Sequence, residues 1–155
     1  IKKQKEVFIA QIEFAKKVKK PLIVHIREAS NDSRQILIDC NAQEVGGVLH
    51  CFNASEHLLP LAEHNFCFGI GGVLTFKNAK KLVEILPEIP KDKLLIETDA
   101  PYLTPHPHRG ERNEPYYTVF VAQKMAELLN ITEEEIQELT TNNAKKLFKE
   151  FSSLS

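Results

Sequence analysis

Four short apolar runs recur along the chain, and each is followed by a segment with the spacing of an amphipathic helix. Strands that are nearly all apolar and separated by helices are typical of a parallel sheet covered by those helices. The sequence therefore predicts an α/β fold. We expect the strands at 21–26, 46–52, 66–71 and 93–98, and the helices after them at 32–41, 55–64, 77–86 and 116–129.

Three of these runs end in imidazole or carboxylate side chains. His25 and His50 close the first two, and Glu97 and Asp99 close the last. In a parallel barrel the C-terminal ends of the strands converge on one face, where such proteins carry out their chemistry. Two imidazoles and a carboxylate gathered there are the ingredients of a divalent-metal site with open coordination positions. The pattern thus indicates an enzyme or a large piece of one.

The number of strands limits the architecture. A doubly wound sheet could be built from four strands, but its ligands usually sit at one switch point, whereas here they end three separate strands. Four strands are half of an eight-stranded barrel. A half-barrel has two unpaired edges and an uncovered inner face, and both favour association. We therefore expect a fragment, or one part of a split or dimeric assembly.

Length, charge and cysteine spacing indicate which class of protein this chain belongs to. A chain of 155 residues can bury a core, and we expect a single domain over 1–155. The formal charge of −1 gives no global attraction to nucleic acid or anionic lipid, so a polyanion would have to be held locally. Three cysteines without C-x-x-C spacing suit reduced thiols in the cytoplasm. We expect no membrane span and no signal peptide.

Local signals place the remaining helices. A stripe at helical spacing from Phe8 to Val18 predicts a first helix that ends before Pro21. Its last turns are rich in lysine, which indicates a solvated helix end or, alternatively, a patch that contacts DNA. The segment 30–33 is N-cap material for the next helix. Thr132 with Glu135 forms a capping-box pattern, and we expect a separate last helix from Asn142.

The chain resembles the TatD family of metal-dependent deoxyribonucleases, within the amidohydrolase-like barrels. The resemblance runs from the first helix to about Phe148 and corresponds to the C-terminal three-fifths of such a protein. It implies that the strands are numbers five to eight of a TIM-type (β/α)8 barrel, with the N-terminal strands absent. The family's His-x-His pair and bridging Glu have no counterpart in this sequence. Four segments carry the likeness, at 21–28, 46–53, 94–103 and 107–115.

The resemblance also implies roles for the strand-end residues. His25 and His50 would be ligands of one metal through neutral imidazoles. Asp99 would bind a second metal and act as the base for an attacking water; its alternative is an Asx turn or helix N-cap before Ala100. Glu97 shares the strand face of Asp99. We therefore expect it to orient a metal ligand by a hydrogen bond, to form the pocket floor, or to make a structural ion pair.

The loop that follows carries candidate substrate contacts. Arg109 and Arg112 could grip phosphates, because a planar guanidinium matches phosphate oxygens in pairs. His108 could add a donor or a ligand. The alternative is that Arg109 and Glu114 pair with neighbours and stiffen a long connection. Tyr102, with Phe52, could stack a base at the rim or simply pack, and we expect Cys51 to be a packed thiol.

The expected function is hydrolysis of a phosphodiester in DNA, in an exonuclease-like mode and with one or two divalent metals. Mg²⁺ or Mn²⁺ would suit the oxygen ligands, while the histidines also suit Zn²⁺ or Ni²⁺. Two alternatives remain open. One is an amide, lactone or phosphotriester hydrolase of the same fold. The other is a non-catalytic half-barrel that acts in an oligomer, either with a missing N-terminal half or with copies of itself.

Overall fold

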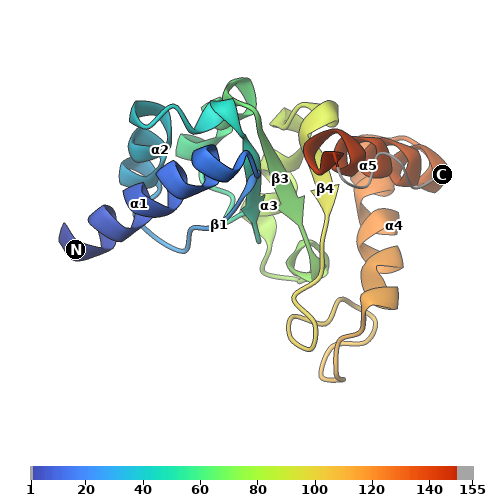
Figure 1. Cartoon of the computed structure of the whole chain (residues 1–155). Coiled ribbons are helices and arrows are strands. Elements are labelled where there is room, and N and C mark those ends of the chain that lie inside the picture. The colour runs from blue at the N-terminus through green and yellow to red at the C-terminus, as the bar shows by residue number, and fades with distance from the viewer. Residues whose placement is uncertain (1, 150–155) are drawn as a thin grey trace.

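The computed structural model describes residues 2–149, which are built around one four-stranded parallel sheet (Figure 1). The strands are β1 (Leu22–His25), β2 (Gly47–His50), β3 (Phe66–Ile70) and β4 (Leu94–Ile96). Their order in the sheet is β1-β2-β3-β4, which is their order in the sequence. A doubly wound sheet reverses its strand order at a switch point, and this sheet has no such reversal. The predicted parallel α/β arrangement is confirmed, with strands shorter than predicted.

Helices connect the strands and follow the last one. The α-helices are α1 (Lys2–Val18), α2 (Ser30–Asp39), α3 (Lys80–Ile85), α4 (Thr118–Leu129) and α5 (Glu133–Leu147). The 3-10 segments are η1 (Ala42–Glu44), η2 (Glu56–His64), η3 (Gly72–Thr75), η4 (Leu86–Glu88), η5 (Lys91–Lys93) and η6 (Pro115–Tyr117). None of the helices within residues 2–149 is long and apolar enough to cross a membrane.

Three helix predictions need correction. The helix predicted at 55–64 is 3-10, and Pro60 inside it cannot donate a backbone hydrogen bond. The predicted cap at 30–33 is wrong, because α2 begins at Ser30 after Ala29, whose left-handed backbone precedes the helix without a side-chain cap. The capping box of Thr132 is confirmed, but Asn142 begins no new helix, since α5 continues to Leu147.

One face of the sheet carries the main core. Side chains alternate between the two faces of a strand, and one set packs under the helices. Ile12 of α1 and Met125 of α4 are fully buried against this layer. The strands contribute Val24, Leu49, Phe66, Phe68, Ile70 and Leu94 to it. This continuous apolar layer fixes the strands and therefore the places where they end.

The opposite face has an apolar lower layer and a polar upper one. Val48, Cys67 and Leu95 form a small buried cluster. Leu147 and Phe148, at the C-terminal end of α5, pack against it. His50 has the same orientation as Val48, two residues earlier on β2, and so lies above this cluster. The end of α5 thereby covers the lower layer and leaves the strand ends free for chemistry.

A buried amide holds α5 against the sheet. Asn143 is 3% exposed, and its Nδ2 group donates hydrogen bonds to the carbonyl oxygens of Lys91 and Leu94, each at 2.8 Å. These carbonyls lie at the entry to β4. Asn143 therefore anchors the helix that closes the lower layer.

We predict that Asn143→Ala lowers the free energy of unfolding by about 2 kcal/mol, because two buried carbonyl groups lose their donor. Asn142→Ala is the matched control, since Asn142 is an exposed neighbour on the same helix and gains the same helix propensity. Urea denaturation followed by circular dichroism measures the difference. Equal stabilities of the two variants would contradict the anchoring role.

Candidate metal centre

Strand register brings the two imidazoles together. β1 and β2 pair in parallel with His25 opposite His50, both at the final position of their strands. Directly paired residues point to the same face of a sheet. The two ring centroids are accordingly 5.7 Å apart, with the planes tilted by 46°. The placement of both histidines thus follows from one register.

Glu97 reaches His50 across the intervening strand. It lies one residue beyond β4, and its backbone N–H donates to the Ile70 carbonyl at 3.0 Å, which extends the β4 pairing. Its Oε2 atom accepts a hydrogen bond from Nδ1 of His50 at 2.8 Å. Its Oε1 atom accepts from the backbone N–H of Cys51. A carboxylate on Nδ1 fixes the orientation of the ring and leaves Nε2 as its outer donor atom.

Gly69 provides the space for this contact. A Cβ atom built on Gly69 would clash with Oε2 of Glu97, whereas a Cβ on Gly71 would lie 3.6 Å from the nearest Glu97 atom. Any side chain at position 69 would therefore displace the carboxylate. The glycine of β3 is a requirement for the His50–Glu97 pair, and the residue pattern alone did not indicate it.

Asp99 lies on the other side of the His50 ring. Its Oδ1 atom is 3.3 Å from Nε2 of His50, and its side chain is 43% exposed. The backbone carbonyl of Asp99 accepts from the N–H of Tyr102 at 2.8 Å, so a turn carries the residue. No helix begins at Asp99, and within residues 2–149 no backbone N–H donates to its carboxylate, so the Asx-turn and N-cap alternative lacks support.

The donor types at this site suit a divalent cation, with imidazole nitrogens and a carboxylate on one face. Within residues 2–149, however, no group of three or more His, Cys, Asp or Glu side chains is arranged to hold a metal ion. His50 and Asp99 are in contact, and His25 is the next imidazole. The residues therefore fit part of a metal shell.

Burial and charge shift the proton affinities of the site. Burial lowers the pKa of His50, but the charges and hydrogen bonds of Glu97 and Asp99 outweigh it and leave that pKa raised. Burial also raises the pKa of Glu97, against the opposing effect of His50. Cys51, predicted to be a packed thiol, is instead half-buried with a raised pKa, caused by its partial burial and by the two carboxylates.

In the predicted phosphate-binding loop, Arg109 and His108 both contact neighbouring residues of the chain. The guanidinium of Arg109 lies 4.0 Å from the centroid of the Phe76 ring and donates to the Thr104 carbonyl at 3.2 Å. His108 stacks on Tyr117 with centroids 4.4 Å apart and forms an ion pair with Glu111 at 3.0 Å.

Arg112, which is exposed, lies with Asn113 and Glu114 along a separate small pocket. The contacts of Arg109 match the alternative in which it stiffens the loop, although its partners are Phe76 and Thr104. The substrate role of these three residues stays a prediction.

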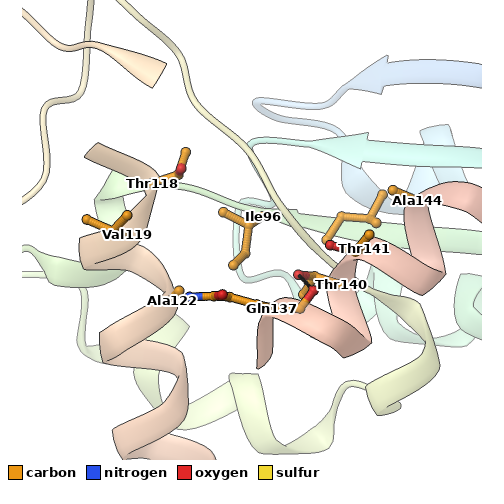
Figure 2. Close-up of a pocket in the computed structure, with 9 residues that line it drawn as sticks. Ile96, Thr118, Val119, Ala122, Gln137, Thr140, Thr141 and Ala144 are labelled. Atoms are coloured by element: carbon orange, nitrogen blue, oxygen red, sulfur yellow. Dashed lines mark hydrogen bonds between the residues drawn. The ribbon is translucent and has the colours of Figure 1, made fainter. Parts of the chain in front are cut away.

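A pocket of about 610 Å³ opens beside the His25 imidazole and contains residues that sequence reasoning missed. His25 and Asp99 line it, while Arg109, His108 and Arg112 are not among its described lining residues. Arg27 and Lys81 contribute its cationic groups. Arg27 lies two residues after His25, and that closeness is the one signal the sequence offered. A second groove of about 500 Å³ lies apart from this site, between β4, α4 and α5, and is lined by Ile96, Thr118, Gln137 and Thr140 (Figure 2).

The chain is similar to proteins of one known family. The profile of the family described as TatD related DNase matches residues 1–149. The chain is 52% identical to the "Uncharacterized metal-dependent hydrolase YabD" of Bacillus subtilis, over 94% of this chain and 58% of that protein. It is 40% identical to the "Uncharacterized metal-dependent hydrolase YcfH" of Escherichia coli K12, over 94% of this chain and 56% of that protein.

A solved structure shows the same fold. The crystal structure of YJJV, a TatD homologue from Escherichia coli K12, matches with a TM-score of 0.82 and 28% identity, over 90% of this chain and 54% of that one. The chain therefore has a TatD-like, TIM-barrel-type α/β fold. It spans slightly more than half the length of the relatives that it matches.

We predict that Glu97→Gln lowers the pKa of the His50 imidazole in the metal-free chain, because the carboxylate charge beside Nδ1 is removed. An NMR titration of the histidine ring resonances measures this shift, with the exposed His57 as internal reference. An unchanged His50 titration would contradict the ion pair.

We further predict that Gly69→Ala has the same effect as Glu97→Gln, although it changes no charge, because the new methyl group displaces the carboxylate from His50. Gly71→Ala is the matched control, since its Cβ makes only ordinary contacts with Glu97. The same titration tests it. A lowered His50 pKa in the Gly71 variant, or none in the Gly69 variant, would show that the space at position 69 is not the cause.

Proposed function

Because the chain belongs to the TatD related DNase family, we propose that it takes part in metal-dependent hydrolysis of phosphodiester bonds in DNA, in an exonuclease-like mode. The observation that carries this proposal is the meeting of His25, His50 and Asp99 at the carboxyl ends of parallel strands, beside a pocket with two cationic side chains. Strand ends of this kind are where barrel enzymes place their reactive groups.

We propose that His25 and His50 bind a divalent metal through neutral imidazoles and that Asp99 adds a carboxylate oxygen to the same centre or to a second one. A bound cation supplies positive charge that neutralises phosphate oxygens and makes water more acidic. Mg²⁺ or Mn²⁺ suits the oxygen donors, and Zn²⁺ or Ni²⁺ suits the imidazoles.

Glu97, Asp99 and the 108–112 loop would have separate roles in the reaction. Glu97 would hold the proton on Nδ1 of His50, so that the lone pair of Nε2 on the neutral ring, 3.3 Å from Asp99, would be available to a bound cation. The carboxylate of Asp99 is more exposed than that of Glu97, and within the described chain no backbone N–H donates to it. It can therefore accept the proton of a water molecule that attacks phosphorus. The loop residues His108, Arg109 and Arg112 remain candidates for contacts with the DNA strand farther from the reacting phosphate.

We propose that a complete active site needs more of the barrel than residues 1–155 supply, and that β1 to β4 correspond to strands five to eight. Within the described chain, β1 and β4 each pair along one edge only. Ile23, which shares its strand face with His25, is 68% exposed. The groove of Figure 2 flanks the second open edge. The relatives' additional length, or a second copy of the chain, would cover these surfaces.

We also propose a cytoplasmic setting, which suits the three free cysteines, Cys40, Cys51 and Cys67.

The alternative function is that of a non-catalytic half-barrel, favoured by the lack of a three-residue metal group within residues 2–149. The two functions predict different results when the chain is mixed with a separate polypeptide that corresponds to the rest of the Bacillus subtilis relative. We predict that DNA hydrolysis with Mg²⁺ or Mn²⁺ appears, or rises strongly, only in the mixture. A mixture that associates but leaves an oligonucleotide intact would support the non-catalytic alternative.

We predict that His50→Ala and Asp99→Ala each lower kcat in that active mixture by at least about a hundredfold. Loss of a metal ligand lowers activity more than loss of a residue that only hydrogen-bonds to a ligand. His57→Ala is the matched control, since His57 is exposed and lies on η2. Gel analysis of a labelled oligonucleotide, with EDTA as the metal-free reference, provides the measurement. Near-normal turnover in either site variant would refute the assignment.

A further inference from the structure

The pocket beside His25 and Asp99 has the size and lining of a ligand site. Its volume of about 610 Å³ lies within the range for sites that hold one small molecule. Phe52 is buried under it and packs edge-on against Phe68, with centroids 4.9 Å apart, so this part of the lining is rigid. Val73 and Leu82 add apolar surface. A flat, apolar part of a ligand would be accommodated here.

Two cationic side chains line this pocket and outnumber the one acidic side chain among its described lining residues. Arg27 follows β1 and Lys81 belongs to α3, so separate elements bring them to one cavity. Both are exposed, and within residues 2–149 neither forms an ion pair, whereas Lys5 and Lys16 do. Asp99 is the acidic residue among the lining side chains. The cations therefore leave positive charge for an anionic ligand.

An aromatic ring stands at the edge of the same pocket. Tyr102 is 71% exposed, and within residues 2–149 its ring has no aromatic partner. Its backbone N–H donates to the Asp99 carbonyl at 2.8 Å, so the turn that carries the proposed base also carries this ring. An exposed ring tied to a reactive residue is suited to stacking with a planar group.

We propose that this pocket binds one nucleotide unit of single-stranded DNA, with Arg27 and Lys81 on the phosphates and Tyr102 stacked on the base. The inference rests on the proposed function for the kind of ligand, and on the pocket for the residues. Arg27 and Lys81, rather than the 108–112 loop, would then make the main phosphate contacts. Arg109 and His108 of that loop already contact neighbouring side chains, whereas the two pocket cations form no ion pair within the described chain.

The cationic part is tested by binding rather than by turnover. Fluorescence anisotropy with a labelled ten-nucleotide oligodeoxythymidine, in EDTA and at several salt concentrations, gives the affinity and its salt dependence. Arg27→Ala and Lys81→Ala should each weaken binding and reduce the slope of log K against log salt by about one. Lys80→Ala is the matched control, because Lys80 is an exposed neighbour that does not line the pocket.

The aromatic part is tested with a second pair of ligands. Tyr102→Ala should weaken binding of the normal oligonucleotide about tenfold. It should leave binding of an oligonucleotide with abasic sites nearly unchanged, because no base is there to stack. Tyr116→Ala is the matched control, since Tyr116 is also 71% exposed but lies outside the pocket.

The outcomes separate this inference from the proposed function. The nucleotide pocket would be overturned if the unaltered chain did not bind the oligonucleotide. It would also be overturned if each control variant, at Lys80 or Tyr116, lost as much affinity as its partner at Lys81 or Tyr102. DNA hydrolysis by the mixture with the rest of the barrel would then still stand. Selective binding losses without any hydrolysis by that mixture would retain the pocket and remove the nuclease.

Discussion

The parallel pairing of β1 with β2 is the constraint on which the site depends. It places His25 opposite His50 at the last paired position of both strands. Glu97 then bonds to one nitrogen of His50 while Asp99 approaches the other. One imidazole therefore lies between two carboxylates, and burial together with these charges determines its proton affinity. A shift of β1 by one residue against β2 would turn His25 toward the helix-covered face and separate it from His50.

The two faces of the sheet explain how a polar site is built on an apolar frame. The helix-covered face contributes large buried side chains such as Phe66 and Phe68, and this burial stabilises the sheet. The other face has apolar residues only in its lower layer, which the end of α5 covers through Leu147 and Phe148. Asn143 anchors α5 at the entry to β4, which is the end of the strand opposite to the site. The helix therefore covers the lower layer and leaves the carboxyl ends of the strands accessible.

The sequence predicts the sheet and the strand-end residues well, because apolar runs and their terminal polar side chains are local features. The positions of His25, His50, Glu97 and Asp99 follow from where the apolar runs end, while their roles at the site stay predictions. Features that depend on tertiary contacts were not predictable in this way. The continuity of α5 past Asn142, the approach of Arg109 to Phe76, and the common pocket of Arg27 and Lys81 join segments that are far apart in sequence or override local signals.

The glycine of β3 has a consequence for how this centre can evolve. β3 contributes no donor atom to the polar layer, so an inventory of ligands would pass over it entirely. Yet Gly69 is the opening through which a carboxylate from one neighbouring strand meets an imidazole from the other. Positions 69 and 97 are therefore expected to be inherited together, and a chain that had lost the acidic residue would be free to fill the opening with a methyl group or more.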